Sequence, residues 1–276
     1  MEKVWLITGC STGFGRELAK AALHNGDKVA VTARNTADVE DIVAGENNAL
    51  SLSLDVTNGG QIKSAVDAVM EKWGRIDVLV NNAGIGYFGA VEESEEAAVR
   101  QMFEINFFGL AHVTQAVLPI MRKQRSGHVV NIASIGGLRA FPAVGFYNAT
   151  KFAVDGLSEA LAKEVAPLGI KVTIVAPSGF RTDWAGRSAE DTAIKIADYA
   201  ETSKLNQDTI RGNSGNQPGD PKLGALAIIK AVESDKPPLR LLLGAAALKG
   251  GRAKLEELKA DFDAWEKTTV GADSPK

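Results

Sequence analysis

The sequence is poor in the residues that bind metals or form disulfides. In 276 residues it has one cysteine, Cys10, and three histidines, His24, His112 and His128. A single cysteine excludes an internal disulfide, and the histidines lack the close spacing of a zinc-binding motif. We therefore expect neither a disulfide framework nor a protein-bound metal.

Long apolar runs and an excess of one charge are also absent. The longest apolar candidate, residues 241–248, is far shorter than the roughly 18 residues of a membrane span, and the N-terminus lacks a secretory signal pattern. Lysine and arginine number 31 against 34 acidic residues, a net charge of −3 without a basic cluster. We therefore expect a soluble, cytoplasmic protein that binds neither membranes nor nucleic acids.

Short apolar runs alternate with longer amphipathic stretches along the chain. Strands that are apolar throughout fit a sheet covered on both faces, and strict strand–helix alternation favours parallel strands. The prediction is an α/β fold, in which one doubly wound parallel sheet of about seven strands carries helices on both faces of a single domain, residues 1–276. The expected strands are 4–8, 28–33, 50–55, 78–81, 128–134, 171–176 and 239–243, and the expected helices are 14–25, 38–44, 59–73, 95–122, 147–167 and 221–232.

Two later segments depart from this alternation. Residues 183–219 are polar and rich in Gly, Ser and Asn, with a short helix expected near 189–200. We interpret them as a lid insertion on the substrate side, with a plain surface insertion as the alternative. Residues 249–276 form a charged helical tail with one apolar face, which predicts docking onto the domain or a partner subunit. That face carries Leu255, Leu258, Phe262 and Trp265.

A glycine cluster, TGCSTGFG over residues 8–15, joins the first strand to the first helix. Glycines there allow a tight turn and close approach of a pyrophosphate, and the helix start offers free N–H groups. A merely tight turn is the alternative interpretation. The residues expected to bind a dinucleotide are Gly9, Ser11, Thr12, Gly13, Phe14 and Gly15.

The ends of the next strands suit the rest of a dinucleotide. Arg34 follows the second strand, where NAD-binding proteins usually carry an acid, and its planar guanidinium fits a 2′-phosphate. We therefore expect NADP(H) to be preferred, with NAD(H) as the alternative, and expect nearby acids such as Asp41 to be solvated. Asp55 is expected to contact adenine or to cap the next helix. Val56, Asn82, Ala83 and Gly84 complete the expected cofactor contacts.

Ser134, Tyr147 and Lys151 form the most specific set. Ser134 ends the fifth expected strand, and Tyr147 and Lys151 lie four residues apart on one helix face. A free tyrosine has a pKa near 10, so acid–base work near neutrality needs a pKa shift of roughly 3 units. A neighbouring ammonium and an oxidised nicotinamide both lower a phenol pKa.

Taken together, these motifs resemble the short-chain dehydrogenase/reductase family over residues 4–232. The matching pieces are TGCSTGFG, DV, NNAG, Asn106, Ser134 and the YNATK run at 147–151, in family order and spacing. The resemblance implies a Rossmann-type domain with an NAD(P)(H) site. It also places Pro177, Gly179 and Thr182 at the nicotinamide, although Ser178 stands where the family often has glycine.

The resemblance further implies the catalytic roles. Tyr147 is the acid in reduction and the base in oxidation, and Ser134 orients the substrate carbonyl. Lys151 lowers the tyrosine pKa and holds the nicotinamide ribose, and Asn106 holds a water of the proton relay. The aromatic residues expected at the substrate mouth, with core packing as their alternative, are Tyr87, Phe141, Phe146 and Trp184.

The resulting hypothesis is an NADP(H)-dependent carbonyl reductase or alcohol dehydrogenase that transfers a hydride between nicotinamide and a ketone, aldehyde or secondary alcohol. One alternative is a non-catalytic NADP(H)-binding sensor on the same fold. Another is an epimerase or dehydratase that uses the cofactor internally. The family resemblance also implies a homodimer or homotetramer.

Overall fold

A computed structural model describes residues 2–186 and 188–274. Its main sheet has seven parallel strands in the order β3-β2-β1-β4-β6-β7-β9. These strands are β1 (Val4–Ile7), β2 (Lys28–Ala33), β3 (Ala49–Ser53), β4 (Val78–Asn81), β6 (Gly127–Ile132), β7 (Ile170–Pro177) and β9 (Arg240–Leu243). The predicted α/β doubly wound sheet is confirmed, and each expected strand matches one of these seven.

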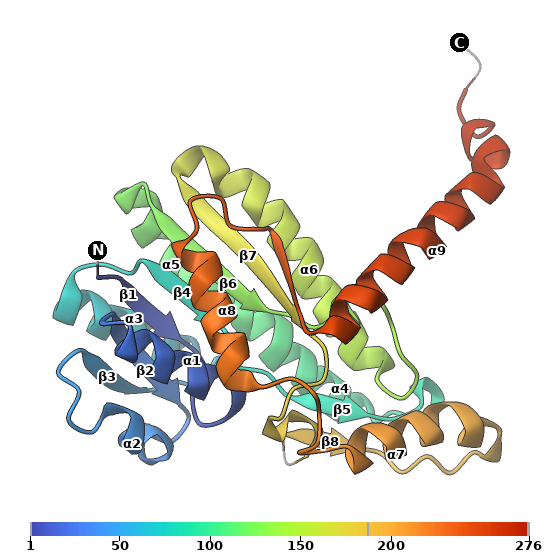
Figure 1. The fold of residues 1–276 in the computed structure, drawn as a ribbon, viewed down its shortest axis with the longest axis horizontal. Coiled ribbons are helices and arrows are strands. Elements are labelled where there is room, and N and C mark those ends of the chain that lie inside the picture. Colours follow the sequence, from blue (N-terminus) through green and yellow to red (C-terminus); the bar gives the residue numbers. More distant parts are fainter. Residues whose placement is uncertain (1, 187, 275–276) are drawn as a thin grey trace.

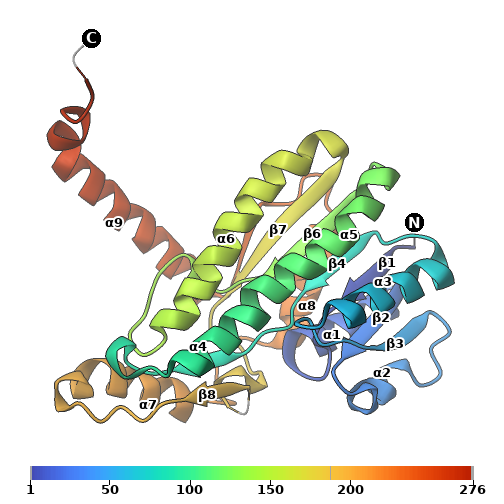
Figure 2. The ribbon, with the colours of Figure 1, turned by 180° about the vertical axis from the view of Figure 1, so that it is seen from behind.

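Helices cover both faces of this sheet (Figures 1 and 2). On one face α1 and α8 pack together, and on the other lie α3, α5 and α6. Their bounds are α1 (Gly13–His24), α3 (Gly59–Trp73), α5 (Leu110–Gln124), α6 (Gly145–Val165) and α8 (Pro221–Glu233). Short helical turns, η1 (Thr36–Val39) and α2 (Glu40–Val43), follow β2. No helix in the described part of the chain is long and apolar enough to cross a membrane.

The helix predicted over residues 95–122 is interrupted. It consists of α4 (Glu96–Phe103), one π-helical stretch η3 (Glu104–Gly109) and α5. At Gly109 a Cβ atom would lie 2.6 Å from the Val56 side chain, so the wide turn passes directly over the end of β3. The extra residue rotates the apolar face by about 100° at one point, while the spacing within α4 and within α5 stays helical, so periodicity alone does not locate the bulge.

Residues 183–219 are more structured than their composition suggests. They contain η6 (Asp183–Ala185), β8 (Ala189–Asp191), two short helical turns η7 (Ala197–Tyr199) and η8 (Ala200–Lys204), and α7 (Leu205–Gly212). β8 pairs in parallel with β5 (Gly86–Phe88), which follows β4. The prediction of a short helix near residues 189–200 is therefore wrong in its position. Strand β8 begins at Ala189, and the α-helix of this segment begins at Leu205. Three-residue strands that pair across about 100 residues leave little local signal.

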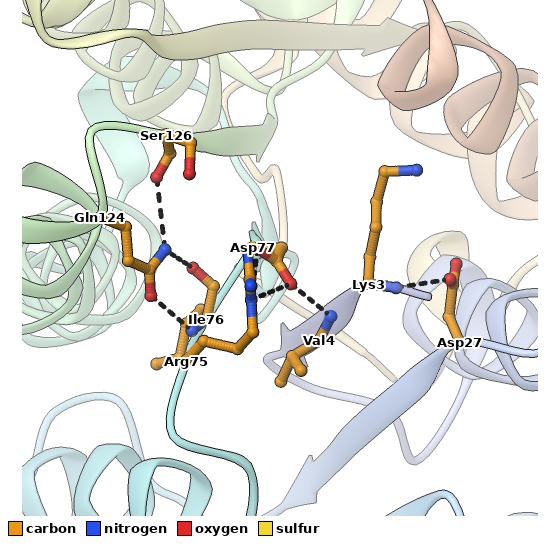
Figure 3. Close-up of polar contacts among 8 residues, drawn as sticks. All are labelled: Lys3, Val4, Asp27, Arg75, Ile76, Asp77, Gln124 and Ser126. Carbon is orange, nitrogen blue, oxygen red and sulfur yellow. Dashed lines mark hydrogen bonds and ion pairs between the residues drawn. The ribbon is translucent and has the colours of Figure 1, made fainter. Parts of the chain in front are cut away.

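Polar side chains, of which Asp27 is buried and Asp77 and Gln124 are half-buried, hold the amino ends of the central strands (Figure 3). Asp27 accepts hydrogen bonds from Lys3 N and Trp5 Nε1, both at 2.9 Å. Asp77 accepts from Val4 N at 2.9 Å and from the Arg75 guanidinium. Gln124 bonds both backbone groups of Ile76 and reaches Ser126 O. The opposite, carboxyl edge of the sheet is left open for a site.

Candidate active site

One large cleft of about 1230 Å³ runs along the carboxyl edge of the sheet. Strand order changes direction between β1 and β4, and in doubly wound sheets ligands bind at such a point. The predicted site residues that line the cleft are Gly9, Ser11, Thr12, Gly13, Phe14, Arg34, Asp55, Val56, Asn82, Ala83, Gly84, Ser134, Phe141, Tyr147, Lys151, Pro177, Gly179, Thr182 and Trp184. Gly15, Tyr87, Asn106 and Phe146 do not line it.

The glycine loop is held against the end of β4. The Asn82 amide donates to Thr8 O at 2.9 Å and to Gly9 O at 2.8 Å, and Thr8 Oγ1 accepts from the Asn82 and Ala83 backbone. Gly9 has φ +70°, and a Cβ there would lie 2.9 Å from Ala83 Cα. At Gly15 a Cβ would lie 2.4 Å from Asn82 Nδ2, so that glycine serves the packing of the loop.

The start of α1 opens onto the cleft beside this loop. Thr12 is the N-cap but makes no side-chain cap hydrogen bond, and the first turn carries no acidic residue. The free N–H groups and the positive end of the helix dipole therefore remain for an anion. This cradle fits the pyrophosphate of a dinucleotide.

One end of the cleft brings together Arg34, Asp38 and Asp55. Asp55 Oδ1 accepts hydrogen bonds from Thr57 N at 2.9 Å and from Thr57 Oγ1 at 2.7 Å. These two bonds, with the positive charge of Arg34, lower the pKa of Asp55. Asp38 was not predicted as a site residue, because its place in a short helical turn suggested a solvated face. Asp41, by contrast, is paired with Arg16 and Lys20 outside the cleft.

Ser134, Tyr147 and Lys151 meet in the middle of the cleft. Ser134 caps the turn η4 (Ile135–Gly137) after β6, where its Oγ accepts from Gly136 N at 3.0 Å. Its side chain also lies beside the phenol of Tyr147, on the first turn of α6, close enough to lower the pKa of that phenol. The Lys151 ammonium donates to Ile132 O at 2.9 Å and lies 5.7 Å from the centre of the Tyr147 ring.

Burial controls the ionisation of this set. It raises the pKa of Tyr147 to about 12, and the neighbouring Ser134 side chain opposes this only in part. Burial also lowers the pKa of Lys151 to about 8. The sequence-based expectation of a lowered tyrosine pKa thus meets a larger opposing effect, because desolvation disfavours both charged forms.

Asn106 lies on the π-helical stretch η3, 1% exposed. Its Oδ1 accepts from Ile85 N at 2.8 Å, and its Nδ2 donates to Ile85 O at 2.9 Å and to Thr150 Oγ1 at 3.3 Å. The amide therefore ties the chain after β4 to α6 instead of facing the cleft. No feature of the sequence encodes that pairing.

The Trp184 ring packs over Tyr147 as a roof. It lies 4.8 Å from the Tyr147 ring and 5.5 Å from the Phe88 ring, centre to centre. At Gly86 a Cβ atom would lie 2.7 Å from Ala189 Cβ and 3.1 Å from the indole, so glycine allows β8 and the indole to pack closely against β5. Tyr87 and Phe146 pack behind this wall, in one cluster with Phe88, so their place corresponds to the core-packing alternative.

Arg211, on α7, clasps the segment that carries Trp184. Its guanidinium donates to the backbone carbonyls of Ala185, Gly186 and Ala189 at 3.1, 2.7 and 2.9 Å. It also bonds Asp191 Oδ2 at 3.0 Å and lies 4.6 Å from the centre of the Phe88 ring. Sequence reasoning missed this residue, because a surface helix with one arginine carries no signal of what the side chain reaches.

The comparisons with known proteins agree with this geometry. The family description "short chain dehydrogenase" matches residues 3–193. The chain belongs to the short-chain dehydrogenase family. It is 38% identical to the oxidoreductase BOA17 of Botryotinia fuckeliana, over 99% of this chain and all of that protein. It is 41% identical to 3-ketodihydrosphingosine reductase of Bacteroides thetaiotaomicron, over 88% of each chain.

Solved structures of the family extend the likeness. A short-chain dehydrogenase from Streptomyces avermitilis matches with TM-score 0.93 and 45% identity, over 99% of this chain and all of that one. A Burkholderia phymatum member in complex with NAD has TM-score 0.83 and 26% identity, over 94% and 95%. The structure of ElxO with NADP bound matches with TM-score 0.75 and 29% identity, over 90% of this chain and 100% of that one. This short-chain dehydrogenase is therefore an oxidoreductase. The NAD and NADP bound in the similar structures support a nicotinamide cofactor for it as well.

Proposed function

We propose that this enzyme is an NADP(H)-dependent carbonyl reductase or alcohol dehydrogenase. The observation that carries the proposal is that Ser134, Tyr147 and Lys151 line one cleft with the free N-terminus of α1 and with Arg34. The name of the Bacteroides relative, a ketone reductase, supports the same reaction class.

The cleft offers a contact to each part of a dinucleotide. The glycine loop and the α1 N-terminus would hold the pyrophosphate, and Arg34 the 2′-phosphate. Lys151 would hold the nicotinamide ribose. When bound, the cofactor delivers or accepts the hydride. The other proposed contacts are Asp55, Val56, Asn82, Ala83, Gly84, Pro177, Gly179 and Thr182.

Proton transfer falls to Tyr147. Its pKa of about 12 keeps the phenol protonated at neutral pH, so in reduction it acts as an acid and donates to the carbonyl oxygen. Ser134 donates a hydrogen bond to the same oxygen as negative charge develops there. In oxidation the phenol must lose its proton, and a positive charge on the nicotinamide favours that form.

Preference for NADP(H) follows from Arg34, but Asp38 opposes it. Both line the same end of the cleft. A guanidinium attracts a 2′-phosphate, whereas a carboxylate repels it and can accept from ribose hydroxyls. We propose that Arg34 sets the preference and that Asp38 limits it, so NAD(H) remains an alternative cofactor.

The substrate half of the cleft favours a small molecule with an apolar body. Its apolar lining includes Ile135, Phe141, Val144, Trp184 and Ile210. A ring or chain can lie against these side chains while its carbonyl reaches Tyr147. Residues 183–219 cover this half, and we propose that they act as its lid.

The test is NADPH oxidation with a panel of ketones and aldehydes, and NADP⁺ reduction with the matching alcohols. Tyr147→Phe should lower kcat/KM at least 100-fold and leave NADPH affinity within a few-fold. Tyr199→Phe is the matched control: it removes the hydroxyl of a half-buried tyrosine that bonds Glu92 outside the cleft, and it should keep turnover within a few-fold of wild type. Near-normal turnover by Tyr147→Phe would contradict the proton-transfer role.

The same assay separates the alternatives. A sensor would bind NADPH without turnover of any carbonyl or alcohol. An epimerase or dehydratase would convert its substrate with no net change in cofactor absorbance. The first outcome is not expected, because Ser134, Tyr147 and Lys151 line one cleft. The second would replace net reduction by internal redox chemistry at the same residues.

A further inference from the structure

The last helix, α9 (Ala245–Val270), projects away from the rest of the protein (Figures 1 and 2). Its first turns hold to the body: Ala247 is buried, and a Cβ at Gly251 would lie 2.8 Å from Leu242. Arg139 forms an ion pair with Glu257 at 3.1 Å. The later turns of α9 extend beyond these contacts, so the rest of the protein does not cover them.

Beyond Gly251, most of the apolar face of α9 is therefore left without a partner in its own chain. Leu255, Phe262 and Trp265 are 67, 68 and 65% exposed. Leu258 is half-buried. Two large aromatic side chains on one projecting helix are unusual for a surface that faces only water. Of the two predicted docking modes, docking onto the domain is thus excluded for these turns.

The spacing of this face selects the shape of its partner. Apolar or small residues recur at steps of three and four along α9: Leu248, Gly251, Leu255, Leu258, Phe262, Trp265 and Thr269. We call these seven residues the α9 seam. A repeat of 3.5 residues keeps one stripe facing a second helix over several turns, whereas a flat surface does not need it. The seam therefore fits another helix with the same repeat.

The charges beside the seam disfavour a parallel pair of such helices. In a parallel arrangement Lys254 would face the partner's Lys259. Asp261 would face the partner's Glu266. Every flanking contact of these residues would then join like charges.

An antiparallel arrangement, centred between residues 256 and 257, changes this balance. Lys254 then faces the partner's Asp261, and the two-fold axis makes this attractive pair twice. Arg252 faces the partner's Lys259, so two repulsive pairs remain. Two attractive and two repulsive contacts are better than four repulsive ones.

We propose that α9 is a dimerisation arm that pairs antiparallel with α9 of a second copy of this chain. Leu255 of each arm packs against the partner's Leu258, and Trp265 lies opposite the partner's Leu248. The helix is roughly 39 Å long, which leaves room for one body at each end of the pair. The seam buries roughly 1,000 Å² over both copies, near the lower limit of specific interfaces, so the dimer should dissociate on dilution.

The first test measures molar mass by light scattering and sedimentation from about 0.1 to 100 µM protein. The seam variant Phe262→Glu/Trp265→Glu places four charges in the two-copy interface. The control variant Ala260→Glu/Ala264→Glu adds the same charge on the outer face of the same helix turns. Circular dichroism and NADPH binding verify that both variants are folded.

The seam variant should halve the mass of the wild-type particle or raise its dissociation constant at least about 100-fold. The control should stay within a few-fold of wild type. A wild-type protein that is monomeric throughout, or a seam variant with unchanged mass, would overturn the proposal.

The second test resolves the orientation by oxidative cross-linking of mixed variants. Lys254→Cys mixed with Asp261→Cys should cross-link, because these positions face each other in the antiparallel pair. Lys254→Cys mixed with Lys259→Cys should not, and the reverse result would refute the antiparallel arrangement. Cys10, fully buried, should not contribute.

Discussion

Replacing Arg211 by methionine should loosen the roof of the active site without unfolding the protein. Methionine keeps an unbranched stem that can pack on Phe88 but removes all donors. Three of the lost hydrogen bonds go to backbone carbonyls, of Ala185, Gly186 and Ala189. These carbonyls belong to the segment that holds Trp184 over Tyr147.

The magnitude follows from these contacts. Bonds from a charged donor contribute about 1.5–3 kcal/mol when fully buried. The Arg211 side chain is 25% exposed, and its partner Asp191 is 48% exposed. Discounting for solvent, we take about 1 kcal/mol for each carbonyl bond and nothing for the ion pair. The roof should thus open about 3 kcal/mol more easily, roughly 100-fold in population.

The assay is amide hydrogen exchange followed by mass spectrometry. Peptides that cover residues 184–191 should exchange up to about 100-fold faster in Arg211→Met, while β4 and β6 should not change. Lys204→Met, which removes an exposed ion pair with Asp208 just before α7, is the matched control. kcat/KM for a carbonyl substrate should fall, and NADPH affinity should not. Unchanged exchange in this segment would contradict the proposal that Arg211 holds it in place.

Three further predictions concern cofactor preference, the buried aspartate at the amino ends of the strands, and the dependence of stability on pH. Arg34→Asp should weaken NADPH relative to NADH by about 10- to 100-fold, and Asp38→Asn should shift the ratio the other way; titration of both cofactors measures it. Asp27→Ala should lower the free energy of unfolding by about 2–4 kcal/mol, because the Trp5 indole N–H loses its partner in the interior; a urea-unfolding change below 0.5 kcal/mol would contradict this. Burial lowers the pKa of His128 from 6.5 to about 4, so the unfolded chain binds one more proton between these values. Stability should therefore fall by roughly 3 kcal/mol as pH drops from about 6.5 to 4, and His128→Gln should remove that part of the dependence in urea unfolding.

Local patterns were sufficient to predict the architecture and most of the predicted site residues that line the cleft. Apolar β-branched runs and amphipathic stretches specify strands and helices through burial and backbone preference alone. Parallel strands then bring their carboxyl ends to one edge, so motifs at those ends share one cleft. That reasoning brought Gly9, Arg34, Ser134, Tyr147 and Lys151 together, and the structure does the same.

The tertiary structure decided which partner each side chain meets. The amide of Asn106 is committed to Ile85 and Thr150, and Asp38 faces the cleft although its helical turn suggested a solvated face. Burial, which sequence spacing does not report, sets the tyrosine pKa high.

Arg211 and α9 illustrate the same division. The sequence determined that α9 is a helix with an apolar stripe, because a repeat within one helix is a local property. Only the structure shows that this stripe leaves the body and that Arg211 reaches back across 20 or more residues to the roof. Contacts between distant segments depend on how the whole chain closes on itself, whereas secondary structure depends mainly on neighbours in sequence.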